Sequence, residues 1–330
     1  MKLTYEQITS AVNGTVRTVK TKSGLELHRF AKEQEDFFYK SHPAFCNDSF
    51  FDGYFGRNCR TCAGVTLDFF SDAKMFEIKF SGMEYAKSSV ERIHFFDLYV
   101  DDKLVCSYKT TDDIVYKASG EKQRFTLVFP TFAFPIISSV ELKDATVFIP
   151  QKKQADILFL GDSITHGAFA VNPSNSYVMR VARKMGIGIL NQGNSGFVYD
   201  KGSISKVCDP KIVVTAYGTN DFMRKSAEQI KTETEDFLIK LKALYKDSKI
   251  VSILPLWSAH DGKDENYKSV ERNCLKNVYE KHSDYIIDGF ALVPHNQKYF
   301  VDSVHPNDDG FAFYGENLAK ELESIISCNI

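Results

Sequence analysis

A serine follows a short apolar run near the middle of the chain. Residues 157–160 read Ile-Leu-Phe-Leu, and Gly161, Asp162 and Ser163 come directly after them. Four large apolar residues are too few for a helix but suit a parallel strand buried on both faces, and Gly161 permits a sharp turn behind it. Because ligands bind at the carboxyl ends of strands in open α/β sheets, the pattern predicts Ser163 as a nucleophile at such an edge. By itself, the triplet is also typical of a tight turn in which the serine caps a helix.

Three later segments combine turn residues with polar side chains. They are Asn191-Gln192-Gly193-Asn194-Ser195-Gly196, Gly218-Thr219-Asn220-Asp221 and Asp302-Ser303-Val304-His305-Pro306. Each follows a predicted strand or precedes the last helix, so we expect all three on loops at the same edge of the sheet. Together with the first segment, they supply a hydroxyl, an imidazole, carboxylates and several N–H donors.

In this order, the segments resemble the four sequence blocks of the SGNH (GDSL-like) hydrolase superfamily, over about residues 155–330. The resemblance implies a three-layer α/β/α, flavodoxin-like domain with a parallel sheet, and it implies no cofactor. It also implies a triad in which Ser163 is the nucleophile, His305 the general base and Asp302 the carboxylate that orients the imidazole. The chemistry agrees, because a serine hydroxyl needs a base and a histidine, with an ordinary pKa of about 6.5, serves as one at neutral pH. An aspartate three residues before the histidine can reach Nδ1 and leave Nε2 for the serine.

The same resemblance implies an oxyanion hole made by the backbone N–H groups of Ser163 and Gly196 and the side-chain amide of Asn220. Such donors stabilise negative charge without transferring a proton. Gly193 is the alternative to Gly196, which we favour because a small residue, Ser195, precedes it. Structural roles are the competing interpretation, since both glycines suit turns and Asn220 suits a helix cap.

Three further side chains are candidates for substrate binding. His166 comes soon after Ser163, Tyr217 directly precedes the third segment, and Trp257 follows the fourth predicted strand. We expect their rings near the predicted edge, where they could meet the ring face and hydroxyls of a sugar. The competing interpretation is packing: for Trp257 in the core, and for His166 on the helix that follows the nucleophile.

Strands and helices alternate from residue 153 onward. The predicted strands cover residues 157–160, 187–190, 212–216, 250–254 and 285–287. The clearest helix covers residues 226–245, where Ser226 and Gln229 resemble a capping box and apolar residues repeat at helical spacing. Five strands with crossover helices predict a three-layer domain.

Before residue 150 the pattern is mainly one of strands, with one short helix predicted near residues 5–12. Apolar residues alternate over 65–70 and 76–80, and residues 96–100 and 104–108 flank a hairpin turn at 101–103. Two more strands, at 140–142 and 147–149, flank a turn near Asp144. This spacing predicts an all-β, jelly-roll-like sandwich over residues 1–152 and a catalytic domain over residues 153–330.

The segment Phe96–Leu104 gives the N-terminal part a less specific resemblance to the β-sandwich of carbohydrate esterase family two and related bacterial esterases. The resemblance implies an architecture and, for the substrate, a saccharide. It names no binding residue in this part of the chain.

Length and charge narrow the possible partners. The 330 residues exceed the size at which a single core stops growing, about 250–300, so two domains are expected. The formal net charge is −2, with 41 basic and 43 acidic residues, and gives no electrostatic reason to expect nucleic acid or an anionic membrane as a partner. The first residues lack an apolar signal core, so we expect a cytoplasmic protein.

The seven cysteines are scattered and odd in number, which favours reduced thiols over a disulfide framework. His42, Cys46, Cys59 and Cys62 have a spacing that would permit zinc. The favoured interpretation is that they are ordinary core and surface residues, and no metal is predicted.

The sequence therefore predicts a serine esterase that removes short acyl groups, acetyl above all, from a hydroxylated and perhaps saccharide substrate through an acyl-serine intermediate. One alternative is a lipase- or thioesterase-like hydrolase of longer acyl chains. The other is a carbohydrate-binding protein whose hydrolase domain is an inactive scaffold. The oligomeric state is left open.

Overall fold

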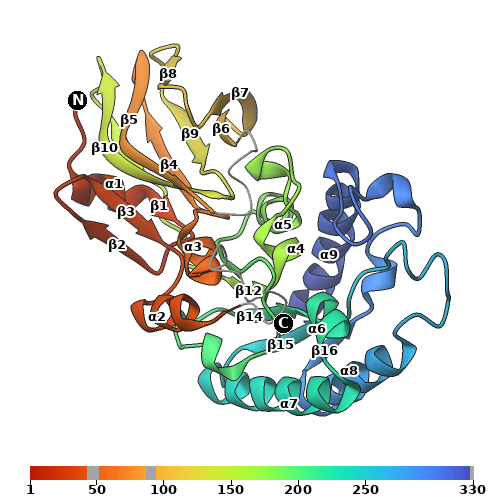
Figure 1. Ribbon diagram of the computed structural model, residues 1–330. Coiled ribbons are helices and arrows are strands. Elements are labelled where there is room, and N and C mark those ends of the chain that lie inside the picture. Colours follow the sequence, from red (N-terminus) through yellow and green to blue (C-terminus); the bar gives the residue numbers. More distant parts are fainter. Residues whose placement is uncertain (43–51, 87–93, 328–330) are drawn as a thin grey trace.

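The computed structural model describes residues 1–42, 52–86 and 94–327 (Figure 1). The N-terminal part holds two antiparallel sheets, and the C-terminal part holds one parallel sheet flanked by helices. The predicted fold class, an all-β sandwich followed by an α/β/α domain, is confirmed. In the described ranges, no helix combines the length and apolar character needed to cross a membrane.

The two N-terminal sheets are built from eleven strands. The first sheet has the order β1-β4-β9-β6-β7, with β11 paired to β4, and the second has the order β2-β3-β10-β5-β8. Their bounds are β1 Val12–Asn13, β2 Arg17–Lys20, β3 Leu25–His28, β4 Thr66–Ser71, β5 Met75–Tyr85, β6 Phe95–Val100, β7 Lys103–Lys109, β8 Ile114–Lys117, β9 Gln123–Val128, β10 Ala133–Lys143 and β11 Phe148–Pro150.

The predicted hairpin across residues 101–103 is confirmed. Strands β6 and β7 are antiparallel neighbours, and Asp101 and Asp102 have φ angles of 47° and 62°, as a tight turn between twisted strands requires. The strands around Asp144 also exist, but they belong to different sheets: β10 pairs with β5, whereas β11 pairs with β4. Alternation identified these strands, but it could not identify their partners.

One apolar core lies between the two N-terminal sheets. Residues of both sheets that alternate along their strands are fully buried in it, among them Leu67, Phe69, Phe76, Ile78 and Phe96. The predicted short helix is α1, Tyr5–Ala11, and Thr4 caps its first turn through a capping box with Gln7.

The parallel sheet has the order β13-β12-β14-β15-β16, which is the flavodoxin-like order. Its strands are β12 Ile157–Gly161, β13 Ile189–Gly193, β14 Ile212–Ala216, β15 Lys249–Ile253 and β16 Tyr285–Ile287. Four of them lie within one residue of the predicted ranges at both ends, whereas β13 begins two residues and ends three residues later than predicted. Strand β12 is buried along its whole length, as expected of a strand with helices on both faces.

Helices cover both faces of this sheet (Figure 1). On one face α5, Tyr177–Met185, packs against α9, Asp308–Ser327, and on the other α7, Ala227–Leu244, packs against α8, Ser269–His282. Helix α7 begins after Ser226, whose capping box with Gln229 confirms the predicted start. Short helices α4, Ser163–His166, and α6, Thr219–Arg224, follow β12 and β14.

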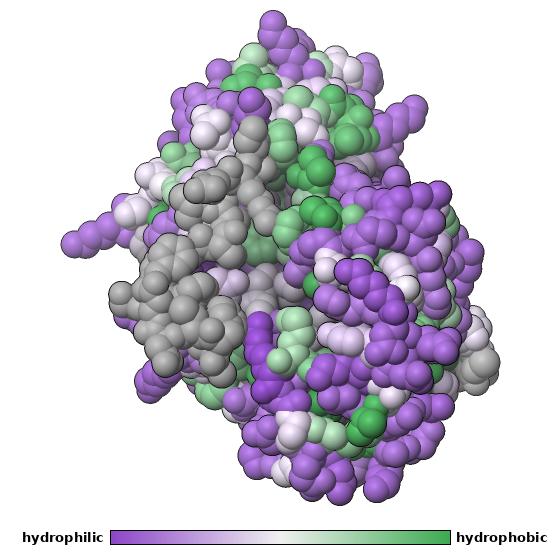
Figure 2. All heavy atoms as spheres, turned by 45° about the vertical axis from the view of Figure 1, so that its right-hand side comes forward, coloured by the Kyte–Doolittle hydropathy of each residue, from purple (hydrophilic) through white to green (hydrophobic). Residues whose placement is uncertain are grey.

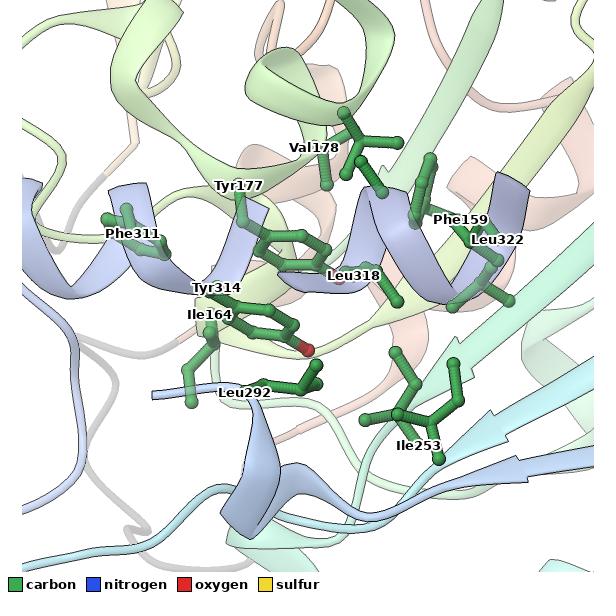
Figure 3. Packing of buried hydrophobic residues seen from close by; sticks show 14 of the residues in the cluster. Phe159, Ile164, Tyr177, Val178, Ile253, Leu292, Phe311, Tyr314, Leu318 and Leu322 are labelled. Atoms are coloured by element: carbon green, nitrogen blue, oxygen red, sulfur yellow. The ribbon is translucent and has the colours of Figure 1, made fainter. Parts of the chain in front are cut away.

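Aromatic stacking joins α5 and α9 above the sheet. The rings of Tyr177 and Tyr314 are parallel, with centroids 4.0 Å apart. Figure 3 shows them beside Leu318 and Leu322 of α9 and Phe159 of β12. Because Tyr177 also shares a 2.9 Å hydrogen bond with Thr165 of α4, this packing fixes the helix that starts at Ser163.

The N-terminal part also contains two helices that the sequence pattern did not predict. They are α2, Lys32–Lys40, and α3, Tyr54–Arg60. Their buried residues, such as Phe38 and Phe55, do not join the sandwich core but pack with Leu190 and Phe197 of the C-terminal part. The division at residue 152 therefore separates the sheets but not the cores, and the division into domains stays a prediction.

Candidate active site

The turn after β12 is built for close packing. A Cβ atom on Gly161 would lie 2.0 Å from Thr165 Oγ1, so no larger residue fits there without displacing α4. Asp162 caps α4 by accepting a 3.0 Å hydrogen bond from the N–H of Ile164. These two residues bring Ser163 to the carboxyl edge of the sheet at the first position of the helix.

Ser163, His305 and Asp302 form a continuous chain of hydrogen bonds. Ser163 Oγ lies 2.7 Å from His305 Nε2, and His305 Nδ1 lies 2.8 Å from Asp302 Oδ2. Asp302 Oδ1 accepts two further bonds, from the backbone N–H groups of Val304 and His305, at 2.9 and 2.8 Å. The structure therefore brings together the three residues predicted as a triad.

The protonation of His305 follows from these contacts. Burial alone would raise the pKa of Asp302, but the hydrogen bonds from the His305 side chain and the two backbone N–H groups hold it well below its ordinary value. An ionised carboxylate only accepts, so Nδ1 donates to it and the neutral ring keeps its lone pair on Nε2. Ser163 Oγ–H can then donate to Nε2, as a general base requires.

The backbone N–H groups of Ser163 and Gly196 have no acceptor within hydrogen-bond distance among the described residues. Gly193 differs, because its N–H donates to Asn191 Oδ1 at 2.8 Å. A Cβ on Gly193 would also lie 2.3 Å from the backbone nitrogen of His166, so this glycine serves the close approach of β13 to α4. Between the two alternatives, the geometry favours Gly196 as the oxyanion donor.

Asn220 lies on α6 with its amide directed toward the turn at Ser163. Its Nδ2 donates to Phe197 O at 3.1 Å and lies 3.3 Å from Asp162 Oδ2. Its Oδ1 accepts from Arg224 at 2.9 Å. Asn220 thus reaches the edge where the sequence predicted an oxyanion donor, and it is not the N-cap of α6, a position taken by Gly218.

Asp162 is buried beside this donor set, and its exposed fraction is 1%. Burial raises the pKa of its carboxyl to about 6, against the lowering effect of the Ile164 N–H and the charge of His305. The carboxyl therefore titrates closer to neutral pH than an exposed aspartate does. No role was predicted for Asp162 from sequence beyond its place in the first segment.

His166 is buried and not at the rim of a groove, and its predicted contact with substrate stays a prediction. Its exposed fraction is 0%, and burial together with the charge of Arg29 lowers the pKa of its ring, so it is neutral. Nε2 faces Thr131 O and Thr61 Oγ1 at 3.2 and 2.7 Å, while Nδ1 accepts from the N–H of Ser195 at 3.3 Å. Because a carbonyl only accepts, Nε2 carries the proton. His166 thereby holds the segment that ends at Gly196.

Tyr217 and Trp257 are also buried, with exposed fractions of 3% and 9%. Tyr217 packs on Tyr199 at a centroid distance of 5.0 Å, and Trp257 stacks on His295 at 5.6 Å. Both rings are engaged by protein, and their predicted contact with substrate stays a prediction. They follow the ends of central strands, where the apolar core and the ligand-binding edge meet, and sequence alone does not separate the two environments.

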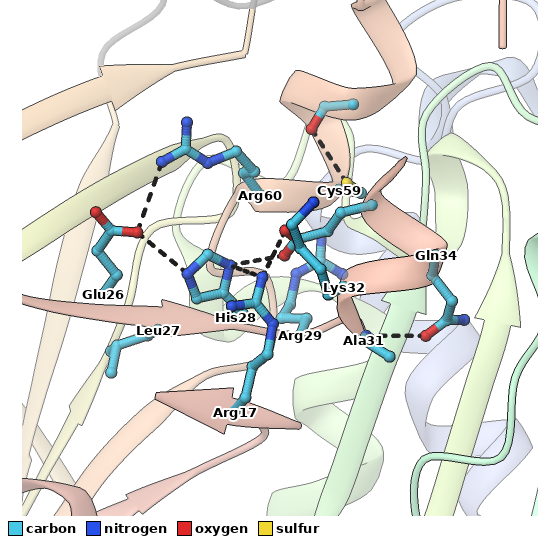
Figure 4. Close-up of polar contacts among 12 residues, drawn as sticks. Arg17, Glu26, Leu27, His28, Arg29, Ala31, Lys32, Gln34, Cys59 and Arg60 are labelled. Atoms are coloured by element: carbon cyan, nitrogen blue, oxygen red, sulfur yellow. Dashed lines mark hydrogen bonds and ion pairs between the residues drawn. The ribbon is translucent and has the colours of Figure 1, made fainter. Parts of the chain in front are cut away.

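Residues of the N-terminal part hold the segment 191–196 from behind. Arg29, fully buried, donates to the carbonyl oxygens of Asn191 and Gly193 at 2.5 and 3.3 Å and to Thr61 O at 2.5 Å. Asn58 donates to Ser195 O at 3.4 Å. Figure 4 shows Arg29 between the β3 strand and helix α3. The sandwich side of the molecule therefore contributes directly to the shape of the predicted oxyanion loop.

A cluster of charged side chains fixes the elements that carry Arg29. The ring of His28 lies between two carboxylates, 2.6 Å from Glu35 and 3.2 Å from Glu26, and Arg17 pairs with Glu35 at 2.5 Å (Figure 4). These bonds join β3 to α2 and to β2. Nothing in the local sequence pattern indicated that residues 17–35 support a site more than 100 residues away.

Cys59 and Cys62 are buried and engaged as thiols. Cys59 Sγ donates to Gly56 O at 3.1 Å, and burial raises the pKa of both thiols, that of Cys62 to about 12. Neutral, buried thiols are poor metal ligands. Among the described residues no group of three or more metal-ligating side chains is found, while Cys46 lies outside these residues.

Two hollows of unequal size are lined by residues that neighbour the triad in space or in sequence. The larger has a volume of about 410 Å³, and one of its walls is Phe169, whose ring lies 4.9 Å from that of His305. Its remaining lining residues are His94, Phe95, Thr131, Phe132, Ala170, Val171 and Pro173. The smaller hollow, of about 30 Å³, lies against Thr219, Phe222, Leu256 and Val304, next in sequence to Asn220 and His305. On the face shown in Figure 2, hydrophobic residues gather beside a hollow in an otherwise mainly hydrophilic surface.

Comparison with known families agrees with this geometry. Residues 159–313 match the model of the GDSL-like lipase/acylhydrolase family. This part of the chain belongs to that family. The matched range contains Ser163, Gly196, Asn220, Asp302 and His305, and the family places the chain among hydrolases that act on esters. No curated protein matches the sequence.

Solved structures share the fold of this GDSL-like hydrolase at low sequence identity. Salicylyl-acyltransferase SsfX3, from a tetracycline biosynthetic pathway, is 16% identical, with a TM-score of 0.76 over 95% of this chain and 94% of its own. A family 2 carbohydrate esterase with a carbohydrate-binding domain from Corynascus thermopiles (Myceliophthora fergusii) is 17% identical, with a TM-score of 0.64 over 81% and 95%. The acetyl xylan esterase Est2A from Butyrivibrio proteoclasticus is 14% identical, with a TM-score of 0.57 over 80% and 90%. The match to the carbohydrate esterases extends over both parts of the chain, as the sequence resemblance implied.

Proposed function

We propose that the chain is a serine esterase that removes acetyl groups from a hydroxylated substrate, a saccharide, through an acyl intermediate on Ser163. The observation that carries the proposal is the hydrogen-bonded chain from Ser163 Oγ through His305 to Asp302. Each of the three side chains lies within hydrogen-bond distance of the atom that its proposed role requires it to contact. The arrangement needs no metal or organic cofactor for ester hydrolysis.

In the first half of the reaction, Ser163 Oγ attacks the ester carbonyl while its proton passes to His305 Nε2. The carbonyl oxygen becomes an oxyanion, which the N–H groups of Ser163 and Gly196 and the amide of Asn220 stabilise. When the tetrahedral intermediate collapses, the bond to the alcohol oxygen breaks and His305 donates its proton to the departing alcohol. Asp302 keeps the ring oriented and stabilises its charged form throughout.

In the second half, water replaces the alcohol. His305 removes a proton from the water, the hydroxide attacks the acyl carbon, and the bond from that carbon to Ser163 Oγ breaks. The proton on His305 returns to Ser163, and acetate leaves. The same groups thus serve both halves, and only the incoming nucleophile differs.

The sizes of the two hollows support a small acyl group and a larger alcohol. The hollow of about 30 Å³ beside Val304 is small, and its size is compatible with a short acyl group such as acetyl. The hollow of about 410 Å³ beside Phe169 has the size of a site for a sugar-sized group, and its aromatic side chains suit the apolar face of a sugar ring. Because His305 protonates the departing alcohol, a hollow whose wall, Phe169, packs on the His305 ring is a suitable place for that alcohol.

Similar structures support the same substrate class. Two of them are a carbohydrate esterase and an acetyl xylan esterase, and another family 2 carbohydrate esterase, from Clostridium thermocellum, was solved with cellohexaose. Each of the three covers 80% or 81% of this chain. A saccharide ester is therefore the first substrate to test.

The experiment is a substrate panel with two variables, acyl length and alcohol. The p-nitrophenyl esters from two to twelve carbons are compared with acetylated xylose and glucose, the latter by acetate release. We expect kcat/KM to be highest for acetyl and to fall with acyl length, and we expect acetate from at least one sugar. Since each buried CH₂ is worth about 0.8 kcal/mol, a lipid or thioester hydrolase would instead show kcat/KM rising steeply through the long chains.

Two results would overturn the proposal. Rising kcat/KM with no acetate from either sugar would favour the long-chain alternative. No turnover of any ester, together with measurable sugar binding, would favour the carbohydrate-binding scaffold.

A further inference from the structure

One guanidinium group bridges two of the predicted oxyanion donors. Arg224, the last residue of α6, donates from Nη1 to Gly196 O at 2.7 Å and from Nη2 to Asn220 Oδ1 at 2.9 Å. Gly196 lies in the loop after β13, whereas Asn220 is one helical turn before Arg224. We propose that Arg224 is a positioning residue that sets the geometry of the oxyanion hole, an inference that rests on the proposed function.

The contact with Asn220 determines which way the amide points. A guanidinium carries only donors, so the atom that faces it must be the carbonyl oxygen Oδ1. Nδ2 then points to the opposite side, where it lies 3.1 Å from Phe197 O and 3.3 Å from Asp162 Oδ2. The two protons of Nδ2 bond Phe197 O and Asp162 Oδ2, and the developing oxyanion would replace the longer of these bonds, that to Asp162. An amide turned by half a rotation would present an acceptor to the oxyanion instead of a donor. Arg224 makes that rotation unfavourable.

The contact with Gly196 restrains a flexible residue. Gly196 has a φ of 77°, a conformation that residues with a side chain rarely adopt, and it carries no side chain with which to anchor itself. One other bond closes this turn, from the N–H of Phe197 to Asn194 O at 3.1 Å. By binding the carbonyl of Gly196, Arg224 fixes the backbone whose N–H group is the predicted donor.

The planar fork of arginine is needed for both contacts. Its two terminal nitrogens donate in fixed directions, and no single lysine ammonium on its shorter reach reproduces two parallel bonds to separate acceptors. The half-buried Arg224 also places a positive charge near Asp162, whose carboxyl lies beside the same amide. Geometry and charge therefore make separable contributions. Arg224→Lys keeps the positive charge but loses the planar fork, whereas Arg224→Met loses both.

The test measures kcat and KM for p-nitrophenyl acetate in Arg224→Met and Arg224→Lys. We expect Arg224→Met to lower kcat by roughly tenfold to a hundredfold, less than the loss of a whole oxyanion donor, with little change in KM. Arg224→Lys should recover only a small part of the loss. Arg183→Met is the matched control. Arg183 lies on α5, and it also donates to a backbone carbonyl, Ser174 O at 2.7 Å. The kcat of this variant should stay unchanged.

Two further measurements separate positioning from a general loss of structure. In a double-mutant cycle, Arg224→Met should cost little in an Asn220→Ala background, because the amide that it orients is then absent. Guanidinium ion at millimolar concentration should partly restore kcat in Arg224→Ala but not in Asn220→Ala. A fully additive cycle without guanidinium rescue would overturn the inference, and so would wild-type kcat in Arg224→Met.

The activities of wild type and Ser163→Ala distinguish a failure of the positioning role of Arg224 from a failure of the proposed function. If wild-type protein hydrolyses acetyl esters and Ser163→Ala does not, the proposed function stands whatever Arg224 does. If the wild type and Ser163→Ala are equally inactive, the function itself has failed, and with it the positioning role.

Discussion

Ser163 Oγ and His305 Nε2 lie 2.7 Å apart, although 142 residues separate them in the chain. The strand-to-helix turn at Gly161 presents one of them, and a tight loop before α9 presents the other. In that loop, Val301 N–H donates to His305 O at 2.9 Å, which holds the imidazole over the serine. This contact therefore joins two distant segments of the chain, and its role in turnover can be tested by substitution.

Ser163→Ala and His305→Ala should each abolish turnover to a similar degree. Nucleophile and base act as one unit, so loss of either costs about as much as loss of both. Steady-state kinetics of the two single variants and of the double variant on p-nitrophenyl acetate check this. A double variant far slower than either single variant would show that the two residues act independently.

Asn220→Ala should lower kcat by roughly a hundred- to a thousandfold, the usual cost of one oxyanion donor. Thermal unfolding is measured alongside, since the amide also bonds Phe197 O. Asn317→Ala on α9 is the control, because this amide also donates to a backbone carbonyl, Leu292 O at 3.1 Å, and kcat should stay within a few-fold. Unchanged kcat in Asn220→Ala would remove this residue from the oxyanion hole.

Asp302→Asn should reduce kcat severely, yet less than Ser163→Ala. The amide can donate a proton to Nδ1 and so hold the wrong tautomer, but the nucleophile and the oxyanion donors stay in place. The comparison is of kcat between the two variants under identical conditions. Wild-type activity in Asp302→Asn would mean that Ser163 and His305 work as a dyad.

His166→Ala should destabilise the fold by about 2–4 kcal/mol, because it leaves the buried Ser195 N–H and Thr131 O without their partner. Urea unfolding measures the loss, and kcat should fall as the segment before Gly196 loosens. Ser195→Ala removes only the serine hydroxyl and keeps both the His166 ring and the backbone N–H of residue 195. It should therefore lower the free energy of unfolding by less. A fully stable and active His166→Ala would show that the segment 191–196 holds its shape without the ring.

Asp162 should make the free energy of unfolding depend on pH. Its pKa is raised from 3.8 to about 6 in the folded protein, so the folded state favours the protonated form. This contribution is fully present below about pH 4 and is lost as pH rises through about 6, by about 3 kcal/mol in total. The charges nearest to it are those of His305, Asp221 and Arg224.

The check is denaturant unfolding of wild type and Asp162→Asn between pH 4 and 7.5. The amide does not titrate, so the difference in unfolding free energy between the two proteins should shift in favour of the variant as pH rises. A difference that stays constant across this range would show that the carboxyl titrates normally despite its burial.

The residues at the carboxyl edge of the sheet could be identified from the sequence, because each of them lies near an element with a recognisable local pattern. Buried strands such as β12 and β14 read as short apolar runs. Ser163 and Asn220 follow these two strands by two and four residues, and His305 comes three residues before α9. Since the carboxyl ends of parallel strands share one edge, the fold class alone was enough to bring them together.

The residues of the N-terminal part that support this edge of the sheet had no such local signal in the sequence. Arg29 contacts Asn191 and Gly193 across more than 160 residues, and α2 and α3 are short helices whose apolar residues pack on the far domain. Arg224 is different, because its spacing of four from Asn220 on one helix would have indicated a shared face. The substrate contacts predicted for His166, Tyr217 and Trp257 stay predictions. The burial of their rings could not be decided from sequence, because polar or aromatic character near a strand end does not distinguish a buried ring from an exposed one.

The most direct test of the account is to trap the acyl-enzyme. Protein is mixed with p-nitrophenyl acetate, quenched in acid within the first turnover, and examined by intact and peptide mass spectrometry. The account predicts one acetyl group per chain, located on Ser163, formed with a burst of p-nitrophenol and absent in Ser163→Ala. An acetyl group on another residue, or turnover by wild type and Ser163→Ala alike without a burst, would contradict it.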